Sequence, residues 1–223
     1  MRVNDEGEAV SMMARRVEPA AATADHASVD PGAVSHRLLV LVKHALPILE
    51  PAVPPRDWLL GSEGECQSRR LAIQLAPYAP FRLVASREPK ALMTGRLLAA
   101  ELDLEVSAAA GLEEFDRPAL PLISREDHER LNEAIFRKPD TPVLGTESAA
   151  DALNRFSRAI RTELARTTTR NLVAISHGTV ISLFVAAHNQ RDAFDIWKSL
   201  ACPSFVVLEV PSFCLRTVVS PAD

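Results

Sequence analysis

In the stretch Leu38-Leu39-Val40-Leu41-Val42-Lys43-His44-Ala45, an apolar run from Leu38 to Val42 is followed by a lysine and a histidine. Such a run is typical of a strand in a parallel sheet that is buried on both faces. A second run, Leu172-Val173-Ala174-Ile175-Ser176-His177-Gly178, has the same form. Because ligands of open α/β sheets bind beyond the carboxyl ends of the strands, we expect His44 and His177 to face one crevice.

Strand-like and helix-like segments alternate along the rest of the chain. The second apolar run is expected to form a strand over 171–176, and further strands are expected over 81–85 and 204–210, with a short one starting at 105–106. Helices are expected over 62–76, 89–102, 148–166 and 179–188. Four prolines make 46–58 a loop. This alternation predicts an α/β three-layer sandwich with a mostly parallel central sheet.

The domain organisation follows from the same pattern. Residues 1–36 show no sustained hydrophobic period, so they are expected to form a disordered tail. Residues 37–215 are expected to form a single domain. Prolines around a helical piece at 125–136 indicate an insertion or lid at about 115–148.

Composition limits the classes of partner. The chain has 223 residues, a formal net charge of −4 and a pI near 5.9, so it has no basic field for nucleic acid or an anionic membrane surface. No apolar stretch approaches the roughly 18–20 residues of a membrane span. Any site for an anionic ligand must therefore be built locally.

The cysteines argue against a disulfide framework. Cys66, Cys202 and Cys214 are odd in number and form no Cys-x-x-Cys pair, so neither paired disulfides nor a zinc site is indicated. A reducing cytoplasm is the expected location, and no metal or other cofactor is expected. The oligomeric state is left open.

Phosphoryl transfer through histidine needs a neutral imidazole that attacks phosphorus and cations that hold the phosphate oxygens. His44, at the end of its strand, is the candidate nucleophile. Lys43 precedes it, and Lys90 lies just after the strand at 81–85. His177 and the amide of Gly178 are expected at a helix N-terminus, which is a favourable place for an anion.

The same chemistry needs an acid that protonates the leaving oxygen. Glu114, in Gly111-Leu112-Glu113-Glu114-Phe115, is the candidate. Its neighbours Glu113 and Asp116 are alternatives.

Six short motifs occur in the order found in the histidine phosphatase superfamily, which includes phosphoglycerate mutases and broad-specificity phosphatases. They are Lys43-His44-Ala45, Leu60-Gly61-x-x-Gly64-x-x-Gln67, Ser86-x-x-x-Lys90-Ala91-x-x-Thr94, Leu112-Glu113-Glu114, Gly145-Thr146-Glu147-Ser148 and Ser176-His177-Gly178. The chain resembles this family over about 37–210.

The resemblance implies a phosphoglycerate mutase-like fold and a metal-independent phosphohydrolase of the histidine acid phosphatase type. It implies a phosphohistidine on His44, phosphate ligation by Lys43, Lys90 and His177, and proton donation by Glu114. A small phosphorylated molecule is the implied substrate.

Three positions depart from the family pattern. Lysine stands at 43 and 90, where the family usually has arginine, and a lysine is a flexible point charge without the planar fork of arginine. Glu50 stands six residues after His44, where many members carry an asparagine that touches phosphate. A carboxylate pointing inward there would repel a dianion.

Three functions remain open at this point. A phosphomonoester hydrolase is favoured, because nothing in the sequence indicates the second substrate orientation that a mutase needs. The alternatives are phosphoglycerate mutase-type transfer and a catalytically weakened module that binds a phosphorylated ligand. The two lysines keep the binding module open, whereas an acid beside two histidines argues for catalysis.

Overall fold

The computed structural model describes residues 37–51, 53–116 and 124–220, so the predicted tail at 1–36 lies outside it. The strands are β1 (Leu38–Lys43), β2 (Phe81–Ser86), β3 (Val106–Ala109), β4 (Asn171–Ser176), β5 (Ser204–Glu209) and β6 (Leu215–Val219). The helices are α1 (Ser62–Leu75), α2 (Pro89–Glu101), α3 (Arg125–Arg137), α4 (Ala149–Ala165), α5 (Gly178–Asn189) and α6 (Ala193–Ser199), with short 3₁₀ turns η1 (Pro55–Asp57) and η2 (Ala76–Tyr78).

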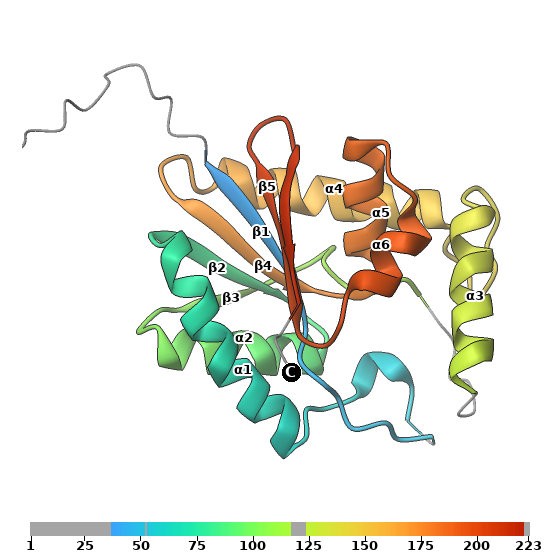
Figure 1. Cartoon of the computed structure of the whole chain (residues 1–223), viewed down its shortest axis with the longest axis horizontal. Helices are drawn as coiled ribbons and strands as arrows, with labels where there is room; N and C mark the ends of the chain where they lie inside the picture. Colours follow the sequence, from blue (N-terminus) through green and yellow to red (C-terminus); the bar gives the residue numbers. More distant parts are fainter. Residues whose placement is uncertain (1–36, 52, 117–123, 221–223) are drawn as a thin grey trace, which may run out of the picture. The chain divides into compact units, whose positions relative to one another are not determined.

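The strands form one mixed sheet in the order β3-β2-β4-β1-β5-β6 (Figure 1). Strands β3, β2, β4 and β1 are parallel, and β5 and β6 are antiparallel to their neighbours. Strands β1 and β4 are adjacent, and Lys43 is in register with Ser176. The residues that follow them, His44 and His177, therefore leave the sheet side by side.

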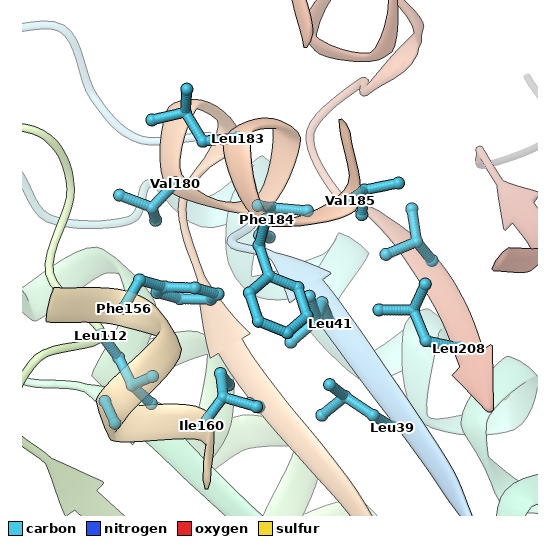
Figure 2. Close-up of a cluster of buried hydrophobic side chains, with 14 of the residues drawn as sticks. Leu39, Leu41, Leu112, Phe156, Ile160, Val180, Leu183, Phe184, Val185 and Leu208 are labelled. Carbon is cyan, nitrogen blue, oxygen red and sulfur yellow. The ribbon is translucent and has the colours of Figure 1, made fainter. Parts of the chain in front are cut away.

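The two faces of the sheet pack against different helices. Alternate residues of a strand point to opposite faces, so Leu39 and Leu41 join one buried cluster and Val40 and Val42 another. The first cluster includes side chains of α4 and α5, among them Phe156 and Phe184 (Figure 2). The second includes side chains of α1 and α2. This confirms the predicted three-layer α/β fold.

Most expected elements form within a few residues of their predicted bounds. Helix α4 begins at a capping box in which Ser148 and Asp151 exchange hydrogen bonds, as expected for serine at a helix start. Strand β6 was not expected from the sequence, and it extends the sheet past residue 215 to Val219. This edge strand is only partly buried, so its sequence carries no apolar run.

The predicted insertion contains α3, but residues 117–123 of it lie outside the described part. Among the residues that the structure describes, no helix combines the length and apolar character required to cross a membrane.

Candidate active site

The loop after β1 is held by three hydrogen bonds that its backbone amides donate to β4, α2 and α1. The amide of His44 donates to Ser176 O at 3.0 Å, and that of Ala45 donates to Thr94 Oγ1 at 3.1 Å. The amide of Leu46 donates to Gln67 Oε1 at 3.2 Å. A Cβ on Gly64 would lie 2.2 Å from the Leu46 carbonyl oxygen, so only glycine lets α1 approach this loop so closely.

His44 is buried with its ring in a defined tautomer. Its Nδ1 lies 2.8 Å from Ala45 O. Because a carbonyl oxygen can only accept, Nδ1 carries the proton and the lone pair of the neutral ring is on Nε2. Burial, followed by the charges of His177 and Lys90, lowers the pKa of His44 well below 6.5. A neutral imidazole of this kind can act as a nucleophile.

His177 lies directly against His44. The two ring centroids are 5.1 Å apart in an edge-on arrangement. The His177 ring is fully buried, and its Nε2 lies 2.9 Å from Ser86 Oγ. The sequence thus brings both histidines together, but His177 is not among the side chains that line the adjacent pocket. Its predicted contact with phosphate remains a prediction.

A pocket of about 900 Å³ opens in front of His44. Five of the residues predicted for the site line it, namely Lys43, His44, Lys90, Glu114 and Gly178. Much of the remaining wall is apolar, formed by Leu46, Pro47, Leu49, Pro55, Trp58, Phe115, Leu131 and Trp197. Glu50 is exposed and does not line the pocket, so the proline-rich loop turns its carboxylate away.

Both predicted lysines already have partners inside the protein. Lys43 Nζ donates to Leu200 O at 2.6 Å, beside the backbone of Gly178. Lys90 is 5% exposed, and its Nζ donates to Pro55 O at 2.7 Å and to the carboxylate of Glu88. Lys90 is therefore a buried cation of the site and not a surface lysine.

Glu114 is held at the start of α5. Its Oε2 accepts from Thr179 N at 3.2 Å, and its Oε1 accepts from Phe115 N at 2.8 Å. The alternatives Glu113 and Asp116 also line the pocket. The Glu113 carboxylate, however, turns back onto its own loop and accepts from Gly111 N at 2.6 Å.

Glu88 lines the pocket, although its sequence context did not predict a place in the candidate site. It occupies the N-cap position of α2 and is 8% exposed. Its Oε2 binds Lys90, its Oε1 accepts from Glu114 N at 2.7 Å, and the same Oε1 lies 3.7 Å from His177 Nε2. The signal available in the sequence was a carboxylate two residues before a lysine in the loop after a strand.

Arg155 was also not expected from the sequence, and it holds the loop that carries Glu114. Its guanidinium donates to the carbonyls of Gly111, Glu113 and Glu114 and makes a two-pronged contact with Glu147. Burial lowers the pKa of Arg155, but the hydrogen bonds and charge of Glu147 outweigh burial, so the pKa is raised. Glu147 thus acts as the partner of Arg155.

The part of the chain that the structure describes contains no group of three or more histidine, cysteine, aspartate or glutamate side chains placed to hold a metal ion. The side chains whose electrostatic interaction lowers the pKa of His44 are His177, Lys90 and Lys43.

Several solved structures share this fold at low sequence identity. A mycobacterial glucosyl-3-phosphoglycerate phosphatase is 21% identical, with a TM-score of 0.65 over 84% of this chain and 99% of that one. An Entamoeba histolytica phosphoserine phosphatase variant, solved with phosphoserine, is 17% identical, with a TM-score of 0.65 over 82% and 97%. Comparison with functionally curated proteins finds no match.

The family comparison covers strands β2 to β5, most of β1 and every residue of the candidate site. The profile of the histidine phosphatase superfamily (branch 1) matches residues 40–210, about three quarters of the chain, from within β1 to just past β5. The chain therefore belongs to the histidine phosphatase superfamily, branch 1.

Proposed function

We propose that this protein is a phosphomonoester hydrolase that acts through a phosphohistidine on His44. The observation that carries the proposal is the tautomer of His44, which lines the pocket. Its Nδ1 proton is committed to Ala45 O, which leaves the Nε2 lone pair for attack. Lys43, Lys90 and the proposed acid Glu114 line the same pocket. The fold neighbours named as phosphatases support this reaction class.

The reaction would run in two steps. His44 Nε2 forms a bond to phosphorus while the ester P–O bond breaks, and Glu114 gives its proton to the departing oxygen. Water then attacks the phosphohistidine, Glu114 takes a proton from it, and phosphate leaves with His44 restored. Lys43, Lys90, His177 and the Gly178 amide are proposed to hold the phosphate oxygens, because developing charge is stabilised best by preplaced donors.

The substrate is proposed to be a small phosphorylated molecule with apolar surface in its leaving group. The pocket wall carries two tryptophans, Trp58 and Trp197, and several aliphatic side chains. Such walls take up the apolar body of a ligand, while a few polar groups fix its orientation. A reducing cytoplasm remains the proposed location, since the three cysteines are free.

Hydrolysis of p-nitrophenyl phosphate by the purified chain tests the proposal. We expect turnover that is unchanged by a metal chelator, because the cationic groups of the proposed site are side chains. Absence of turnover would contradict the hydrolase function. Activity that a chelator removes and a divalent ion restores would contradict metal independence alone.

The titration of His44 gives a second prediction. Its pKa is lowered by burial and by nearby positive groups, so the neutral ring persists as the pH falls below 6.5 and is lost only at the lowered pKa. We expect an NMR titration of ¹³C-labelled histidine, assigned with His44→Asn, to give a His44 midpoint below 6.5. A midpoint at or above that value would contradict the proposed neutral nucleophile.

A weakened binding module is the second candidate, and one observation favours it. Lys90 is already paired with Glu88, which reduces the net positive charge available to a phosphate. The chromogenic assay separates the two candidates, because a binding module gives no turnover. No specific feature of the described residues favours a mutase.

A further inference from the structure

A carboxylate lies inside the part of the pocket proposed to hold phosphate. Glu88 is buried and lines the pocket, whereas the neighbouring His177 is fully buried and does not. The Glu88 oxygens meet two of the groups that a phosphate would use, with Oε2 on Lys90 and Oε1 at 3.7 Å from His177 Nε2. Glu88 thus places a negative charge beside both of these groups.

The ammonium of Lys90 is largely engaged within the protein. An ammonium has three donors, and Lys90 directs one to Glu88 and another to Pro55 O. A phosphate that binds Lys90 must share it with Glu88 or displace that carboxylate. Two anions held a few ångströms apart in a poorly hydrated site repel each other strongly.

We propose that Glu88 is an internal competitor for Lys90 and sets how tightly the site holds a phosphoryl dianion. This inference rests on the proposed function for the place of phosphate. It implies that the phosphoryl group alone gives weak binding, so product phosphate inhibits weakly. Selection of the substrate then depends on the leaving group and on its contacts with the apolar wall of the pocket.

Glu88→Gln is the direct test, because it keeps the side-chain shape and removes the charge. Lys90 would then be a buried cation without its ion partner, which costs stability in the free protein and favours anion binding. We expect orthophosphate to bind at least about tenfold more tightly by calorimetry. We also expect a lower unfolding temperature without phosphate and a larger rise with it.

Glu163→Gln is the matched control. Glu163 is also a buried carboxylate with ion partners, Arg82 and Arg166, but it lies on α4 and does not line the pocket. We expect this variant to lower the unfolding temperature and to leave phosphate affinity unchanged. An equal gain in phosphate affinity in both variants would overturn the role of Glu88.

Phosphate affinity that is unchanged or weaker in Glu88→Gln would overturn the inference, as would absence of binding in both proteins. Loss of the proposed function has a different signature, since wild-type protein would then bind phosphate without turning over p-nitrophenyl phosphate.

Wild-type crystals soaked with orthovanadate provide a test that requires no variant. We expect Lys90 Nζ to contact vanadate and the Glu88 carboxylate to have moved away from Lys90. Vanadate bound by Lys90 with the Glu88 contact intact, or bound without Lys90, would overturn the competition.

Discussion

Replacement of His44 by alanine is expected to lower kcat for p-nitrophenyl phosphate by a factor on the order of 10⁴ or more, the scale seen when a covalent nucleophile is removed. The reason is that, within the part of the chain that the structure describes, no other histidine near the pocket is placed to replace His44. Among the described side chains that line the pocket, His128 is the only other imidazole, and it comes from α3. His177, though adjacent to His44, is fully buried and does not line the pocket. Neither is placed to take over the covalent step.

His188→Gln is the matched control for loss of a histidine. His188 is half-buried near the end of α5, bonds Phe184 O and packs on aromatic rings away from the pocket. Its removal should leave kcat within about threefold, since remote substitutions rarely change chemistry. Label from a ³²P-substrate should remain on wild-type protein after an alkaline quench and be absent from His44→Ala. Hydrolysis retained by His44→Ala, with contaminating phosphatase excluded, would end the phosphohistidine mechanism.

The central strands could be predicted from sequence because a strand that is buried on both faces needs a continuous run of apolar residues. Residues 38–42 and 172–175 form such runs. The positions of His44 and His177 could also be predicted, because each run ends where the chain leaves the sheet. Strand β6 lacks this signal, since one neighbour and partial burial suffice for an edge strand. Helix α6 has only seven residues, too few for a sustained period.

The candidate site was predictable wherever a short motif lies at a strand end. Arg155 is different, because it acts from the middle of α4 on a loop more than forty residues earlier. The amphipathic pattern of α4 is compatible with an arginine at this position, but it does not predict the contact with that loop. The local sequence around Glu88 also indicates nothing more than a charged residue before a helix. Only the folded loop brings it to His177 and to the amide of Glu114.

Glu114, the proposed acid, is the other group whose loss should have a large and selective effect. We expect Glu114→Gln to reduce kcat/KM about 10²–10³-fold for an alkyl phosphate such as β-glycerophosphate, and at most about tenfold for p-nitrophenyl phosphate. The alkoxide is a poor leaving group that needs a proton as the P–O bond breaks, whereas p-nitrophenolate departs without one. The two Glu114 oxygens each accept one backbone bond, from Thr179 N and Phe115 N, and the single amide oxygen of glutamine can keep one of them, so the side chain keeps its size and one of its two anchors.

Glu113→Gln and Asp116→Asn distinguish the three candidate acids. Glu113 accepts from Gly111 N, and Asp116 lies beside Thr146 Oγ1 at 3.4 Å, so neither is anchored at the start of α5 as Glu114 is. Each should change the ratio of alkyl to p-nitrophenyl turnover by less than about threefold. A selective loss on the alkyl ester in one of these variants, with Glu114→Gln unaffected, would transfer the acid role to that residue, because dependence on leaving-group basicity identifies the group that delivers the proton.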